Sequence, residues 1–178
     1  ENDLSGQVDP AWNEIFIGRE RHVENARADY MPYPQRAIRT HDFLYIVNFR
    51  PDRWPLGDPY RLESDNPPSV DELTEATRTT LPDEDAGPTK AWLVGVRNDP
   101  NWNTFFDWVY GKRPREELYD LRADPHQTRN VAQVPEYAET RESLERRLLD
   151  ELKHTGDPRL IDEGRFFETP PMSGPTDE

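Results

Sequence analysis

The sequence contains no cysteine. Disulfide bonds, thiol catalysis and cysteine-ligated zinc are therefore excluded within this chain. The lack of cysteine does not determine the cellular compartment, because many exported proteins also lack it. No apolar run approaches the roughly 18 residues that a membrane-spanning helix needs, and no signal peptide is recognisable. We therefore expect no membrane partner. Because the chain starts at Glu1 rather than Met, we expect its natural beginning to lie upstream.

Hydrophobic residues are scarce, at 33% of 178, and charged residues reach the same 33%. This composition favours disorder, but 5 Trp, 7 Tyr and 7 Phe indicate a modest core, and 18 Pro indicate many irregular connections. The net charge of −14 argues against a nucleic-acid partner, because phosphate binding needs a cationic surface.

The clearest local pattern is a hairpin. Residues 37–40 and 43–47 are rich in β-branched and aromatic side chains, and His41-Asp42 between them is suited to a tight turn. The apolar residues Ile15 to Ile17 predict an earlier, short buried strand, and residues 116–121 predict a later one.

Helices are expected in two places. Ser69 and Glu72 form a capping-box pattern at the start of a short helix, and residues 89–99 and 101–113 are aromatic-rich segments that we interpret as helices, with strands as the alternative. From Pro135 onward the sequence predicts one long amphipathic helix, because Leu144, Leu148 and Leu152 recur every four residues. Gly156 is suited to end this helix.

The order of these elements predicts an α+β fold. A small antiparallel sheet of about four strands packs against a long C-terminal helix. We expect one domain over residues 1–160 with a helical insertion at about 69–112, followed by a flexible tail at 161–178.

Several catalytic and nucleotide-binding motifs are absent from the sequence: G-x-G-x-x-G, the P-loop, H-E-x-x-H and G-x-S-x-G. No carboxylate pair has a spacing suited to acid–base catalysis. We therefore predict no catalytic residue and no metal ligand in this chain. His41, His126 and His154 are each expected to be structural, in two turns and at a helix end.

The most suggestive group is GRERH, residues 18–22, which directly follows the strand predicted at Ile15 to Ile17. Loops that leave strand ends often carry function, and Arg and His side chains can bind sulfate or carboxylate groups. The candidate binding residues are Arg19, Glu20, Arg21 and His22. The alternative is a solvated charged loop in which Glu20 and Glu24 pair with the arginines.

Two further arginines flank the hairpin. Arg36 and Arg39 lie three residues apart, so on one strand their side chains point to opposite faces. One of them can reach inward, and salt bridging to Asp or Glu is the simpler interpretation.

Two stretches together resemble a known family. GRERHVENARADYMPYPQRAIRTHDFLYIVNF, followed downstream by GKRPREELYDLRADPHQTRNVA and a long helix, resembles the C-terminal region of type I sulfatases. The resemblance is greatest to the N-sulfoglucosamine sulfohydrolase (heparan N-sulfatase, or sulfamidase) branch. It spans roughly residues 10–158, and its second half is shared by many sulfatases.

The resemblance implies an alkaline-phosphatase-like hydrolase that removes sulfate ester or sulfamate groups from glycans. It implies calcium and a formylglycine in an N-terminal domain, but the C/S-x-P/A-x-R motif is absent here. This chain then corresponds to the C-terminal subdomain, inactive alone, whose partners are the N-terminal sulfatase domain and a sulfated glycan. His22, with neighbours Arg19, Glu20 and Arg21, would line the rim of the substrate pocket and grip the sugar.

Two alternatives remain open from the sequence. One is a non-enzymatic carbohydrate-binding or interaction module, and the other is the C-terminal part of a different alkaline-phosphatase-superfamily hydrolase. For the sulfatase interpretation, a periplasmic or secreted location is expected from where sulfated glycans occur.

Overall fold

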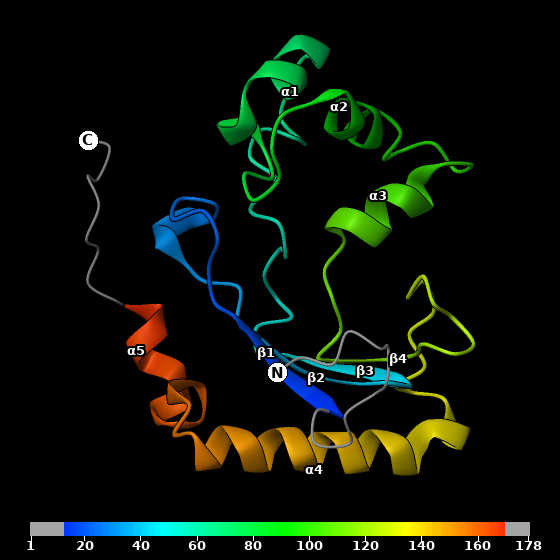
Figure 1. The fold of residues 1–178 in the computed structure, drawn as a ribbon. Helices are drawn as coiled ribbons and strands as arrows, with labels where there is room; N and C mark the ends of the chain where they lie inside the picture. Colours follow the sequence, from blue (N-terminus) through cyan, green and yellow to red (C-terminus); the bar gives the residue numbers. More distant parts are fainter. Residues whose placement is uncertain (1–12, 170–178) are drawn as a thin grey trace, which may run out of the picture.

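A computed structural model describes residues 13–169. Four antiparallel strands form one sheet in the order of the chain, and a long helix covers one of its faces (Figure 1). The strands are β1 (Glu14–Arg19), β2 (Gln35–Thr40), β3 (Phe43–Asn48) and β4 (Glu116–Asp120). The helix is α4 (Ala138–His154). The predicted α+β fold is confirmed.

The β2–β3 hairpin forms where the sequence predicts it. Ile38 lies opposite Tyr45, and Arg39 lies opposite Leu44. The hydroxyl of Thr40 accepts a hydrogen bond from the Phe43 backbone N–H at 3.0 Å, which helps to close the turn at His41-Asp42.

The main core lies between the sheet and α4. Leu144, Leu148 and Leu152 are buried against strand residues such as Tyr45 and Leu118, as the four-residue repeat predicts. The helix ends at His154, and Gly156 two residues later adopts a φ of +66°, which glycine adopts readily. The backbone N–H groups after the helix bond back to its last-turn carbonyls, which is a Schellman end.

The insertion between β3 and β4 is helical and has a core of its own. It contains α1 (Val70–Glu75), α2 (Pro88–Gly95) and α3 (Asn103–Tyr110), so the two aromatic-rich segments are helices rather than strands. The capping box of Ser69 and Glu72 is present. Residues buried in this second core include Leu73, Leu93, Val94, Phe106 and Tyr110.

Strand β1 exists as predicted, but it is not buried. It lies at the edge of the sheet, and Ile15 and Ile17 are 50% and 47% exposed. Three consecutive apolar residues cannot distinguish a strand buried in its own domain from one that leaves an apolar face open. The expectation of burial was therefore wrong for this part of the chain.

Ordered structure continues beyond α4. Short 3-10 helices at Pro158–Leu160 and Asp162–Gly164 lead into α5 (Arg165–Glu168). The remaining 3-10 turns are Ala28–Tyr30, Thr77–Thr79 and Pro135–Tyr137. Within the predicted tail, residues 162–168 form the 3-10 helix Asp162–Gly164 and α5, and Glu168 pairs with Arg53 and with the buried Arg159. The rest of the predicted tail, from residue 170, lies outside the described residues.

Candidate substrate-binding site

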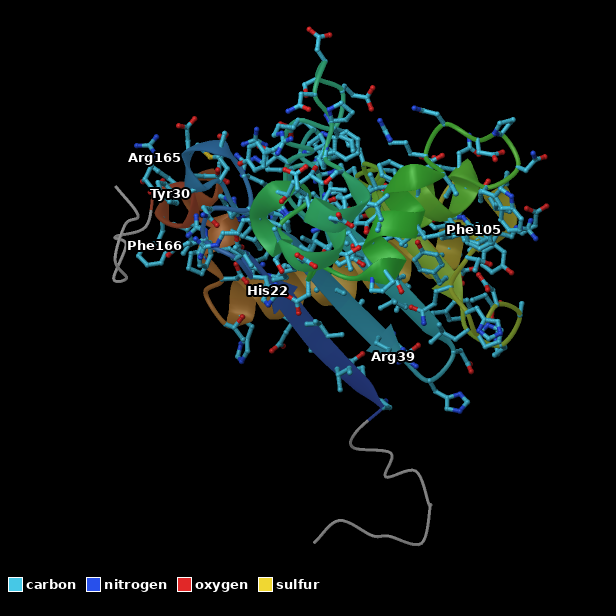
Figure 2. The ribbon with its side chains drawn as sticks, turned by 90° about the horizontal axis from the view of Figure 1, so that it is seen from above. His22, Tyr30, Arg39, Phe105, Arg165 and Phe166 are labelled. Atoms are coloured by element: carbon cyan, nitrogen blue, oxygen red, sulfur yellow. The ribbon has the colours of Figure 1, made fainter. Side chains whose placement is uncertain are left out.

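The segment GRERH leaves the sheet at the end of β1. Arg19 is the last residue of the strand, and Glu20, Arg21 and His22 follow it in the loop. Figure 2 shows His22 beyond this end of β1, whereas Arg39 lies near the opposite end of the sheet. The structure therefore brings the four predicted site residues together at one end of the edge strand.

Asp83 organises the first half of this loop. Its carboxylate accepts hydrogen bonds from Arg19 Nη2 at 2.9 Å and from Arg27 Nη2 at 2.8 Å. The Val23 backbone N–H donates to its other oxygen at 2.8 Å. The Asp83 side chain is fully buried and that of Arg27 is 2% exposed. Two guanidinium groups therefore share one buried carboxylate, which fixes the backbone on either side of His22.

The loop that carries Asp83 is itself held firmly. The buried Lys90 ammonium on α2 donates to the carbonyls of Thr77, Leu81 and Glu84 at 2.8–3.1 Å. Burial lowers the pKa of Lys90 from its ordinary value. These three bonds tie the ends of the loop to α2, so the insertion helices position Asp83 beneath the GRERH segment.

Glu20 belongs to a second ionic cluster. It pairs with Arg36 at 2.8 Å and with the buried Arg159 guanidinium. Arg36 also binds Asp157 at 2.6 Å, and Arg159 binds Glu168 at 2.8 Å. This cluster joins the end of β1 to the segment after α4. The two arginines flanking the hairpin lie on opposite faces, as predicted: Arg36 is the buried one and forms salt bridges, while Arg39 is exposed.

Arg21 and His22 differ in what remains available to a ligand. Arg21 donates to the backbone carbonyls of Tyr30 at 2.7 Å and Phe167 at 3.2 Å, and burial lowers its pKa. The His22 side chain is 70% exposed, and its Nδ1 lies 3.8 Å from Asp83 Oδ1. Of the four predicted residues, His22 is thus the most open to a ligand. The other three are engaged by partners within the chain.

A cleft of about 570 Å³ lies alongside this loop. It runs between α3 and the face of the sheet that α4 leaves free. Its lining includes Arg19, Gln35, Ile46, Trp108, Arg113, Glu117, Tyr119 and His126. Arg19 connects the cleft to the segment that carries His22. The exposed His126, predicted to be structural, lines the cleft as well.

Sequence reasoning missed the residues that hold the site. Asp83 lies in a stretch that looks like a linker, and its arginine partner Arg19 is 64 residues away in the chain. Arg159 and Glu20 are 139 residues apart. No local pattern identifies such partners. The aromatic richness of residues 101–113 was the one signal that pointed toward the cleft.

The described residues contain neither a metal site nor a membrane span. No group of three or more His, Asp or Glu side chains between residues 13 and 169 is arranged to hold a metal ion. Within the same range, none of the helices combines the length and apolar character needed to cross a bilayer.

Comparison with known proteins gives two relatives in sequence. Human (Homo sapiens) N-sulphoglucosamine sulphohydrolase is 29% identical over 152 residues, which are 85% of this chain and 25% of that protein. The ulvan-active sulfatase of Formosa agariphila is 28% identical over 144 residues, which are 75% of this chain and 21% of that protein. No protein-family profile matches the chain.

The chain also matches a solved structure of a protein in complex with its substrate D-glucosamine-2-N,6-O-disulfate. The matched region covers 84% of this chain and 18% of that protein chain. Its TM-score of 0.39 and 15% identity are too low to define a shared fold.

Both relatives in sequence are sulfatases, and the resemblance predicted from the GRERH and ELYDL stretches is confirmed. Within that class, the chain resembles the C-terminal region of an N-sulfoglucosamine sulfohydrolase-like enzyme. It spans about a quarter of the length of the curated relatives it matches.

Proposed function

We propose that this chain is the C-terminal part of a sulfatase that removes sulfate ester or sulfamate groups from glycans. The observation that carries the proposal is the 29% identity to N-sulphoglucosamine sulphohydrolase over 85% of the chain. Since both sequence relatives are sulfatases, this function is favoured over that of another alkaline-phosphatase-like hydrolase.

The role of this chain in that reaction is to bind the sugar at the pocket rim. His22 is proposed as the residue that contacts substrate, because it is exposed while Asp83 and its arginines fix the loop around it. An imidazole can donate a hydrogen bond to a sugar hydroxyl or a sulfate oxygen. Arg19, Glu20 and Arg21 act mainly by holding the loop, through the contacts described above.

The bond-breaking chemistry is proposed to reside in an N-terminal domain. Formylglycine and calcium there would supply the attack on sulfur and the stabilisation of charge. In that arrangement, this chain orients the sugar. A location in the periplasm or outside the cell is part of the proposal, because sulfated glycans occur there.

The N-terminal domain is proposed to pack against β1. Ile15, Phe16 and Ile17 are exposed on this edge strand, and apolar patches of this kind mark interaction surfaces. Relatives three to four times as long have ample further chain to cover such a surface. The same contact would bring the reacting groups toward the end of β1, where His22 lies.

The proposal is tested by His22→Ala in the complete protein that contains this chain. We expect kcat/KM for sulfate release from N-sulfoglucosamine to fall about 10–100-fold, equivalent to losing roughly 1.4–2.7 kcal/mol of binding in the transition state. Sulfate is measured by ion chromatography, and melting temperature is expected to stay unchanged.

The matched control is His41→Ala. This exposed histidine pairs only with its neighbour Asp42 in the β2–β3 turn, at the other end of the sheet. Its loss should leave kcat/KM within about twofold of the parent. If both variants retain full activity, His22 does not contact the substrate.

A further inference from the structure

Four aromatic side chains form a cluster on the outside of the helical insertion, called the aromatic cluster below. It consists of Trp92 on α2, Trp102 just before α3, and Phe105 and Trp108 on α3. The ring centroids of Trp92, Trp102 and Phe105 lie 5.9–6.0 Å from one another, and that of Trp108 lies 5.5 Å from Phe105, yet each residue is 39–48% exposed. The rings therefore form one continuous aromatic surface in contact with solvent.

Folding of the insertion does not explain this aromatic cluster. The opposite sides of α2 and α3 already supply the second core through Leu93, Val94, Phe106 and Tyr110. Large aromatic side chains that gather on a surface, outside the core, mark a binding function. Phe105 is labelled in Figure 2, on the opposite side of the molecule from Phe166 of α5.

The aromatic cluster borders the cleft. Trp108 lines the cleft together with Arg113, and both residues lie above the free face of the sheet. Trp108 thus belongs to both the cluster and the cleft. A ligand that occupies the cleft and extends outward past Trp108 would meet the other three rings as one patch.

A buried carboxylate lies among the residues that line the cleft. Glu117 is 5% exposed, and it accepts hydrogen bonds from Asn48 Nδ2 at 2.8 Å and from the Tyr119 hydroxyl at 2.5 Å. Both donors are neutral, whereas buried carboxylates are usually paired with a cation. A carboxylate has about four acceptor positions. Glu117 can therefore accept further hydrogen bonds from a ligand.

The charges of the lining restrict the class of ligand. Arg19 and Arg113 line the cleft together with Glu117, and Arg19 shares the single charge of Asp83 with Arg27. The three arginines outnumber the two carboxylates, so this region carries a local positive balance in a chain of net charge −14. A sulfated sugar suits this environment. Its hydroxyl groups can donate to Glu117, its sulfate groups are attracted to the arginines, and its apolar C–H face can stack on Trp108.

The composition of the aromatic cluster differs from that of the protein-docking surface proposed on β1. The exposed apolar residues of β1 are Ile15, Phe16 and Ile17, whereas every member of the cluster is aromatic. Aromatic rings offer flat faces on which the C–H face of a sugar can stack.

We propose that the cleft and the aromatic cluster form one binding surface for a sulfated oligosaccharide. One sugar stacks on Trp108 in the cleft with a hydroxyl group on Glu117, and the chain continues onto the patch made by Phe105, Trp102 and Trp92. The inference rests on the proposed glycan substrate and extends it. The protein recognises sugars beyond the one whose sulfate is removed.

The test uses the complete protein and a sulfated heparin-derived hexasaccharide as the probe. Binding is measured by isothermal titration calorimetry for the parent, Trp108→Ala and Phe105→Ala. Each variant is expected to bind about fivefold or more weakly, in line with the loss of one aromatic stacking contact. Glu117→Gln is expected to weaken binding as well, because it replaces one acceptor oxygen with a donor. Phe166→Ala, an exposed aromatic on α5, is the control and should bind as the parent does.

A second measurement covers the case in which a variant unfolds. Tryptophan fluorescence of the parent is recorded with and without the hexasaccharide, and acrylamide quenching is expected to fall when the sugar covers the exposed rings. Unchanged affinity in all three variants, or quenching that the sugar does not alter, would overturn the proposal.

The binding assay also separates this inference from the proposed function. Calorimetry does not depend on turnover. Hexasaccharide binding that requires Trp108, without any sulfate release, would sink the enzymatic proposal and keep the surface. Sulfate release with binding that is independent of Trp108 would do the reverse.

Discussion

At the scale of single residues, the candidate site depends on charges buried inside the chain. Asp83 pairs with both Arg19 and Arg27, and Glu20 pairs with both Arg36 and Arg159. Buried pairs of this kind contribute little net stability compared with apolar residues, but removing one partner is costly because the other charge is left uncompensated. Their effect here is to fix the conformation of the loop that presents His22.

Asp83→Asn tests this arrangement. The amide keeps the shape of the side chain but leaves Arg27 buried without a counter-charge. We expect the free energy of unfolding to fall by about 3–5 kcal/mol, measured by urea denaturation followed by circular dichroism. The neighbouring exposed Asp85→Asn should change it by less than about 0.5 kcal/mol. A loss below 1 kcal/mol for Asp83→Asn would show that this carboxylate does not hold the loop.

The sequence predicted the site residues as a group but not their partners. Arg19 to His22 are adjacent in the chain, so any fold keeps them close. Their counter-charges come from other elements, at separations of 64 residues for Asp83 and 139 for Arg159. Such contacts depend on the tertiary fold, and no local spacing encodes them. The charged-loop alternative was right that the arginines are paired, but the carboxylate that Arg19 binds is neither Glu20 nor Glu24.

At the scale of elements, periodic patterns were reliable guides. The β2–β3 hairpin and α4 formed as predicted, because β-branched and aromatic residues around a tight turn favour paired strands and the four-residue leucine repeat specifies one buried helix face. The burial of β1 was predicted wrongly, since its apolar residues face outward at the sheet edge. The segment after α4 was missed because arginine–carboxylate pairs, rather than an apolar stripe, hold it in place.

The segment after α4 is expected to respond to pH. Burial alone would raise the pKa of Asp157 and of Glu168, but hydrogen bonds from Arg36 to the first, and from Arg53 and Arg159 to the second, outweigh it and hold both pKa values below the ordinary range. A carboxylate with a depressed folded-state pKa stabilises the fold above its unfolded-state pKa. That contribution is lost as the pH falls through the folded-state pKa.

The prediction is that docking of residues 158–168 weakens below about pH 4, where unfolded Asp and Glu take up protons. Hydrogen exchange of this segment, corrected for intrinsic rates, should show protection that is constant from pH 7 to about 5 and declines below. Asp157→Asn should flatten the decline, because it removes one of the two titrating groups. Protection that is independent of pH down to 3 would contradict this account of the segment.

At the scale of the whole molecule, the described chain is a sheet covered on one face by α4, with a helical insertion on the other side (Figure 1). The free face of the sheet and α3 enclose the cleft, and β1 leaves an apolar edge uncovered. This layout could be predicted as a fold class from the order of elements. The cleft could not, because Arg19, Trp108 and Glu117 come from three separate elements and meet only after folding.

Both open surfaces fit a chain that works as part of a larger enzyme. The relatives are about four to five times as long as the segment they share with it. In the proposed assembly, β1 contacts the catalytic domain, His22 binds the reacting sugar, and the cleft with its aromatic cluster binds the sugars that follow.

The most direct test of the central claim is sulfate release by the complete protein. The purified protein is incubated with N-sulfoglucosamine and with a sulfated glycan, and free sulfate is quantified by ion chromatography. The account predicts sulfate release from at least one of these substrates by the complete protein, and none by the 178-residue chain alone. Absence of sulfate release from both by a folded complete protein that carries formylglycine and calcium would contradict it.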